Sequence, residues 1–294
     1  MKKFGCSLLA VSFLSAFAGI VSAQEKSYPP PKVLLIMREY TKPGKAGAVH
    51  DKAESAFVQA FARAKWSTTH YFGMTSLSGK SRALFFTPYE SFEAWEKDTQ
   101  ATEKNAALSA ALDRATAADG ELLDSSDQGV FVYREDFSLR APVDIPHMRY
   151  MDIGVFRVKP GREKEWSDGV KMVLAASEKS DSQAHWACYE SAYGAPGGTF
   201  LFITPLKSAA EIDHSLEQGK AFAAAMGEDG MKKLSDLSVA SIESSESNVF
   251  AFNPRMSYVP DEWIKADPDF WTTKPAGAPA ARPTAEGKKE KPAQ

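Results

Sequence analysis

Apolar residues follow a strand-like period in some stretches of the chain and a helical period in others. In the first half, the strand-like runs are 33–40, 69–77, 83–86 and 130–137. A stripe at the spacing of an amphipathic helix follows the first run; its residues are Ala53, Phe57, Ala60, Phe61 and Ala64. A second helix is expected after the third run. The pattern predicts the element order β-α-β-β-α-β.

The second half repeats this order. Lys42-Pro43-Gly44 recurs as Lys159-Pro160-Gly161, and Thr87-Pro88 recurs as Thr204-Pro205, both at an offset of 117 (159 − 42 and 204 − 87). Self-similarity at one offset indicates an internal repeat. Four strands and two helices in this order are typical of the ferredoxin-like unit.

The first strand of a repeat has large apolar residues on both faces. Leu35 and Met37 alternate with Leu34 and Ile36, so helices on one side of the sheet leave the other side uncovered. The sheet of the second repeat can cover it. We therefore predict an α+β fold. In it, two ferredoxin-like βαββαβ repeats pack their antiparallel sheets face to face as an intramolecular dimeric α/β barrel.

The predicted organisation has further segments around the two repeats. We place the first repeat at 33–139, a linker at 140–148 and the second repeat at 149–259. Residues 260–272 are expected to clasp the barrel through Trp263, Phe270 and Trp271, and the Pro- and Lys-rich tail 273–294 is predicted to be disordered. At the entry to the second helix of each repeat, the pairs Thr87/Glu90 and Ser208/Glu211 are expected to form capping boxes.

The first 23 residues have the form of a secretory signal peptide. Lys2 and Lys3 precede an apolar run over 8–20, and small residues at 21–23 form the cleavage signal. The run is too short to span a bilayer. We therefore expect a secreted or periplasmic chain with no membrane span. Removing the signal peptide leaves Cys188 as the single cysteine, which we expect to be buried on a strand.

Charge and motifs exclude several function classes. The formal charge of −3 becomes −5 (−3 − 2) without Lys2 and Lys3, and no basic face is apparent, so nucleic-acid binding is not expected. The sequence has no His-x-His or Cys-x-x-Cys spacing, and neither a metal nor a cofactor is expected.

The Lys-Pro-Gly turn before the first helix and the "ESFEAW" entry to the second resemble a known family. It is the dimeric α/β-barrel family, which includes antibiotic-biosynthesis monooxygenase-like and NIPSNAP-like proteins, and the resemblance covers both repeats. Its haem-degrading members carry an Asn on the first strand, a Trp ending the third and a His on the second helix. These positions fall on Met37 and Gly154, on Phe86 and Ile203, and on Asn105 and Phe222. The resemblance thus implies the fold but not haem degradation.

Candidate ligand-binding residues follow from this alignment. If the Asn position points inward, alternation places Glu39, Tyr150 and Asp152 on the barrel-facing side. Asp152 is the strongest of them, because a mid-strand carboxylate needs a partner or a raised pKa, and the latter makes a general base. A strand-end acid or an ion pair is the alternative. The remaining candidates are His70 and His185, as bases or as hydrogen-bonded structural histidines, and Phe86.

Two functions stay open. The first, which we favour because no catalytic set matches, is an exported non-catalytic barrel that binds a small apolar ligand or a protein partner; further dimerisation is open. The alternative is a cofactor-independent monooxygenase-like enzyme that acts on an aromatic or polyketide-like small molecule in the barrel cavity. A cavity of about 300 Å³ or more, with aromatic walls around convergent polar groups, would favour the enzyme.

Overall fold

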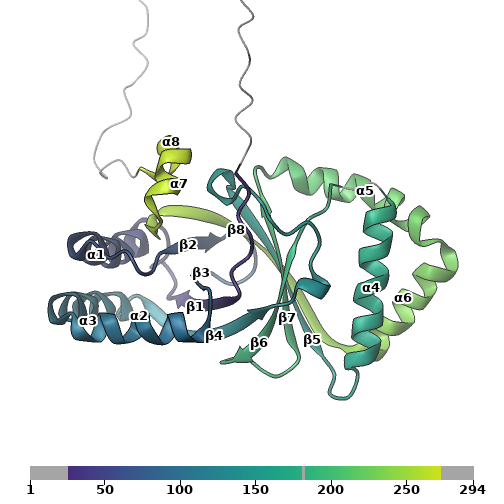
Figure 1. Cartoon of the computed structure of the whole chain (residues 1–294), viewed down its shortest axis with the longest axis horizontal. Coiled ribbons are helices and arrows are strands. Elements are labelled where there is room, and N and C mark those ends of the chain that lie inside the picture. Colours follow the sequence, from purple (N-terminus) through teal and green to yellow (C-terminus); the bar gives the residue numbers. More distant parts are fainter. Residues whose placement is uncertain (1–25, 181–182, 273–294) are drawn as a thin grey trace, which may run out of the picture.

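The computed structural model describes residues 26–180 and 183–272. The predicted signal peptide and the predicted disordered tail lie outside these described residues. Eight antiparallel strands close into one barrel, and the helices of the two repeats cover opposite sides of it (Figure 1). The predicted α+β fold with an intramolecular barrel is confirmed.

Each repeat has one helix more than predicted. The first consists of β1 (Val33–Thr41), α1 (Ala48–Ala64), β2 (Tyr71–Ser76), β3 (Arg82–Tyr89), α2 (Phe92–Lys104), α3 (Ala106–Gly120) and β4 (Leu123–Tyr133). The second consists of β5 (Tyr150–Val158), α4 (Glu163–Lys179), β6 (Ala187–Tyr193), β7 (Thr199–Leu206), α5 (Ala210–Met226), α6 (Glu228–Ser241) and β8 (Ile242–Tyr258). The predicted second helix is thus two helices. In the first repeat Asn105 separates them, and its side chain accepts a hydrogen bond from the Leu108 amide at 3.1 Å.

The expected capping boxes are wrong. β3 continues through Thr87 and Pro88 to Tyr89, paired with β1, and the cap of α2 is Ser91, whose hydroxyl accepts from the Ala94 amide at 3.1 Å. In the second repeat, α5 has no side-chain cap at all. The sheet pairing extends these strands past the point at which local sequence would start a helix.

The barrel closes where the two four-stranded sheets meet. Around the barrel the strand order is β1-β3-β2-β8-β5-β7-β6-β4, so the junctions between repeats are β2 with β8 and β4 with β6. β8 is 17 residues long. Its first part pairs with β5 and its second part, from Phe250 onward, pairs with β2.

Alternate residues of all eight strands point into the barrel interior. Leu34 and Ile36 of β1 share one buried cluster with Met151 and Ile153 of β5. The opposite face of each strand packs against helices; Val33, for example, lies in a separate cluster with Trp95 of α2. Both faces of the sheets are covered, as the apolar pattern predicts.

The segments between and after the repeats pack against the barrel. Two short helices follow β8, α7 (Asp261–Ala266) and α8 (Pro268–Trp271). The Trp271 indole donates to the Pro146 carbonyl at 2.8 Å, and Arg149 pairs with Asp267 while its guanidinium lies 4.0 Å from the centre of the Phe270 ring. No helix in the described part of the chain combines the length and the apolar character needed to cross a bilayer.

Candidate functional site

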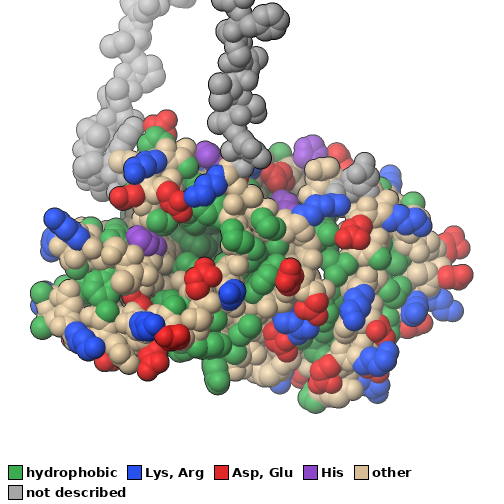
Figure 2. All heavy atoms as spheres, viewed as in Figure 1, with side chains coloured by type: hydrophobic (Ala, Val, Ile, Leu, Met, Phe, Trp, Pro, Cys, Tyr) green, Lys and Arg blue, Asp and Glu red, His purple; other side chains and the backbone are tan. Residues whose placement is uncertain are grey.

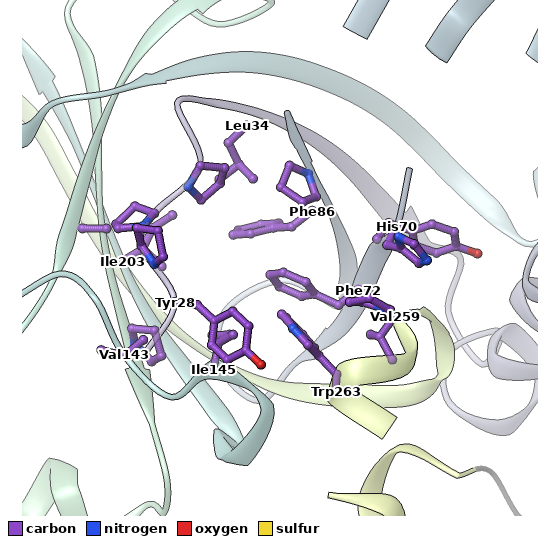
Figure 3. A pocket seen from close by; sticks show the side chains of 18 of the residues that line it. Tyr28, Leu34, His70, Phe72, Phe86, Val143, Ile145, Ile203, Val259 and Trp263 are labelled. Atoms are coloured by element: carbon purple, nitrogen blue, oxygen red, sulfur yellow. The ribbon is translucent and has the colours of Figure 1, made fainter. Parts of the chain in front are cut away.

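A cavity of about 380 Å³ opens at one end of the barrel. Both repeats line it: Leu34, Phe72 and Phe86 come from the first, and Met151 and Ile203 from the second. Figure 3 shows Leu34, Phe72, Phe86 and Ile203 around an open centre, with Tyr28, Ile145 and Trp263 on another side of it. In the space-filling view, a hollow lined with hydrophobic side chains opens below α7 and α8 (Figure 2). The cavity has the size and apolar character of a small-molecule site.

His70 is the basic group of this cavity. It immediately precedes β2, and its ring stacks on Tyr258 at 5.2 Å between centroids and 14° between planes. Burial lowers the pKa of His70, and the nearby acids Asp261 and Glu262 oppose this only in part. The described residues offer its ring nitrogens no hydrogen bond. His70 is therefore a neutral imidazole at pH 7, free to accept a proton.

A second pocket, of about 360 Å³, lies between the outer face of the second sheet and helices α4 and α6. Its walls include Trp166, Trp186 and Phe202, and Asp152 projects from β5 into it. Burial raises the pKa of Asp152, and no side chain in the described ranges forms a hydrogen bond or ion pair with its carboxylate. A carboxylate in this state is a stronger base than an exposed one.

The corresponding region of the first repeat contains charged residues instead. We call them the outer cluster: Glu39 on β1, His50 and Glu54 on α1, and Asp119 on α3. The His50 Nε2 atom lies 3.1 Å from a Glu39 oxygen, 3.3 Å from an Asp119 oxygen and 3.9 Å from a Glu54 oxygen. All four residues are buried, at 2–9% exposure.

Burial governs the protonation of the outer cluster. Burial, together with the charges of Glu39 and Asp119, raises the pKa of Glu54 to about 9. Burial alone would lower the pKa of His50, but the surrounding carboxylates outweigh it and raise the pKa to about 10. Without another cation, the cluster therefore keeps protons that exposed carboxylates would lose.

Three of the predicted residues face the other side of the sheet. Glu39 contacts His50 of α1, and Asp152 lines the pocket under α4 and α6. Tyr150 is on the same face of β5 as Asp152, since the alternate residues Met151 and Ile153 belong to the interior cluster. The two-residue alternation is confirmed, but the face expected to point inward is wrong, because Met37, on the same face as Glu39, packs on the helix side with Phe85.

Two of the remaining candidates line the barrel cavity, and the third does not. His70 and Phe86 line the barrel cavity, and their role as ligand-binding residues stays a prediction. His185 does not; its Nε2 lies 2.7 Å from the Pro205 carbonyl oxygen, a hydrogen bond typical of a structural histidine. Sequence reasoning missed the outer cluster. The four-residue spacing of His50 and Glu54 is a local signal of one helix face, but Asp119 is 65 residues further along the chain (119 − 54).

No protein-family model matches this sequence, and no curated protein matches it. Among solved structures, a proposed monooxygenase from Fusobacterium nucleatum subsp. nucleatum is 12% identical with a TM-score of 0.48, over 76% of this chain and 93% of that one. An anthrone oxidase-like protein is 14% identical with a TM-score of 0.46, over 79% and 94%. A chlorite dismutase variant from Candidatus Nitrospira defluvii is 9% identical with a TM-score of 0.44, over 80% and 95%.

The favoured prediction of a non-catalytic module is corrected. The barrel cavity exceeds about 300 Å³ and has aromatic walls, and the polar residues His70, Glu90 and Glu262 are among its lining residues, which favours the enzyme alternative. At 9–14% identity, the solved structures named above indicate neither a substrate nor a catalytic residue. The chain is a dimeric α/β-barrel protein in fold, with both halves of the barrel in one polypeptide.

Proposed function

We propose that the protein is a monooxygenase-type enzyme that oxidises an aromatic small molecule in the barrel cavity, with His70 as general base. The observation that carries this proposal is an imidazole without a hydrogen-bond partner among the described residues, on the wall of an aromatic-lined cavity. We also propose that the enzyme acts outside the cytoplasm, as the predicted signal peptide implies.

The cavity favours a flat and uncharged substrate. Its walls are mainly apolar and include the rings of Phe72, Phe86 and Trp263, which suit stacking against an aromatic ligand. Glu90 and Glu262 also line it, and their carboxylates disfavour an anionic substrate. Since little water is held by such walls, a carbanion formed there is shielded from competing protonation by solvent.

The reaction that fits is oxygenation of an activated methylene group by O₂. The His70 imidazole removes a proton from the C–H bond, and the resulting carbanion forms a C–O bond with O₂ to give, after protonation, a hydroperoxide. Loss of the second C–H proton then breaks the O–O bond, and a carbonyl group and water are formed. The substrate supplies all four electrons, and O₂ accepts them. A general base contributes about 10²–10⁴-fold to such a step.

Oxygen uptake with a ring-activated methylene compound tests the proposal. Anthrone is a suitable probe, with its conversion followed by an oxygen electrode and by product absorbance. We expect His70→Gln to lower the turnover rate about 100-fold or more while anthrone binding persists. His185→Gln is the matched control, because His185 holds the corresponding place before β6 but lies outside the cavity. If the turnover rate of His70→Gln equals that of the wild type, His70 is not the general base, and the proposed active site in the barrel cavity is wrong.

The Asp152 pocket is a second candidate for the same reaction. Its carboxylate has a raised pKa, no partner among the described side chains, and aromatic neighbours in a pocket of similar volume. Asp152→Asn keeps the shape of the side chain and removes the base. If Asp152→Asn abolishes turnover and His70→Gln does not, the active site lies under α4 and α6 instead of inside the barrel.

A further inference from the structure

The outer cluster holds more negative charge than its protein neighbours can compensate. Its three carboxylates converge on one imidazole, and none of the ion pairs in the described chain brings Lys or Arg to any of them. A single Nε2–H can serve only one of the three facing oxygens. Buried carboxylates that lack a partner are strongly disfavoured, so the cluster must take up either protons or a cation.

Two carboxylate oxygens in the cluster have no hydrogen-bond partner. Glu54 Oε1 and Asp119 Oδ1 are both fully buried, and neither accepts a hydrogen bond, although both face His50 Nε2, at 3.9 Å and 3.3 Å. The hydroxyl of Tyr71 is also buried without a hydrogen-bond partner. Native proteins rarely leave several buried polar atoms unsatisfied at one place, so these atoms indicate a ligand-binding site.

We propose that the outer cluster is a structural site for one divalent transition-metal ion, with Zn²⁺ as the best match. The four ligand atoms lie within 4.8 Å of one another, and three of the separations are 3.1–3.9 Å. A tetrahedral site with bonds of about 2.1 Å places its ligand atoms about 3.4 Å apart. Small side-chain movements therefore suffice to bring all four into coordination.

The ligand set selects among cations. One imidazole and three carboxylates suit Zn²⁺, and also Mn²⁺ or Fe²⁺. Ca²⁺ takes six to eight oxygen ligands, and Mg²⁺ keeps several waters, for which a site with four buried ligands has little room. Because the protein supplies all four ligands, the site is closed, and its role is to hold α1 and α3 against β1.

The fold itself does not require this cluster. In the second repeat, Phe156 occupies the position of Glu39, and α4 packs Trp166 and Val170 beneath it. An aromatic core therefore joins helix to sheet at that place in one repeat, while the other uses four ionisable groups. The difference is the one expected if a metal ion joins helix to sheet in the first repeat.

Metal binding to the full chain, without an affinity tag, tests the inference. The protein is stripped with a chelator and dialysed, then offered Zn²⁺, Mn²⁺ or Mg²⁺ separately. We expect one Zn²⁺ per chain by elemental analysis, a weaker response to Mn²⁺ and none to Mg²⁺. At a free concentration about 100 times the Kd, Zn²⁺ should raise the Tm by about 5–10 °C.

Glu54→Gln separates metal coordination from a proton-sharing cluster. If the cluster coordinates the metal, the Zn²⁺ affinity of this variant falls by about 10- to 100-fold or more. Glu178, near the end of α4, is exposed, so the control Glu178→Gln should keep the wild-type affinity. If the cluster only shares protons, wild type shows no Zn²⁺-dependent Tm shift, and the inference is overturned. Zn²⁺ binding that is equal in wild type and Glu54→Gln overturns it as well. Should Glu54→Gln not fold, Asp119→Asn removes a ligand from α3 with the same expected loss.

Discussion

Glu39 and Phe156 occupy the same position in the two repeats. Each is the seventh residue of a nine-residue strand, and each faces the helices of its own repeat. Glu39 pairs with Ala83 and Ser126 of the neighbouring strands, whereas Phe156 pairs with Phe200 and Ser245. The backbone position is the same in the two repeats, but a carboxylate facing ionisable groups in the first repeat is replaced by an aromatic ring facing aromatic groups in the second.

This relationship predicts that a carboxylate cannot replace the aromatic ring. Phe156→Glu would place a charge against Trp166 and Phe202 without a partner, and we expect it to lower the free energy of unfolding by about 2–4 kcal/mol. Phe156→Leu, which keeps the site apolar, should cost less than about 1.5 kcal/mol. Urea unfolding of both variants gives the comparison, and equal losses would contradict it.

Gly73 is required at the junction of β2 and β8. A Cβ atom there would lie 2.7 Å from the Met256 carbonyl oxygen and 2.8 Å from the Met256 Cβ. Gly73→Ala should therefore destabilise the protein by about 1–3 kcal/mol. Gly219, in the middle of α5, has open space at the same position, so Gly219→Ala should stabilise by about 0.5–1 kcal/mol. Thermal unfolding of the two variants should show Tm shifts of opposite sign.

The pKa of His70 predicts how activity and stability change with pH. The folded pKa is lowered from 6.5, so the base form exists above that lowered value. The turnover rate should rise with pH through a pKa below 6.5 and be level by pH 7. The stability that depends on a neutral His70 is present above pH 6.5 and is lost as the pH falls through the lowered pKa. His70→Gln should remove this acid-side loss of stability, and an unchanged profile would contradict the assignment.

Cys188 should be inert in the folded protein. Its side chain is fully buried on β6, as expected from the sequence, and burial raises the pKa of its thiol well above the ordinary value. Because the thiolate is the reactive form, a thiol reagent such as dithionitrobenzoate should label it only after unfolding. Labelling in native buffer at the rate seen in denaturant would show that β6 opens readily.

Much of the fold follows from local sequence. The paired Lys-Pro-Gly turns place the repeats in register, and the apolar residues on both faces of 33–40 call for a layer on each side of the sheet. The helix entry predicted at Thr87 is wrong, because sheet pairing with β1 holds Thr87 and Pro88 in a strand against their local preference. Contacts of this kind depend on residues about 50 positions away.

The candidate site was harder to predict. Period-two alternation separates the two faces of β5 but does not say which face is inside, and Asp152 lies on the helix side and not on the predicted barrel side. The outer cluster joins Glu39 to Asp119, two acids without a common motif, and only the packing of α3 beside α1 brings them together. Residue spacing along the sequence can identify a site on a single helix or strand. It cannot identify a site whose residues come from β1, α1 and α3.

The length of β8 has a consequence for how the molecule comes apart. Because this strand hydrogen-bonds to β5 of its own repeat and then to β2 of the other, neither half keeps a complete sheet once the strand detaches. Melting of one repeat would expose the hydrophobic interior of its neighbour to water. The two homologous halves should thus behave as a single cooperative unit in denaturation, despite the internal duplication of the chain.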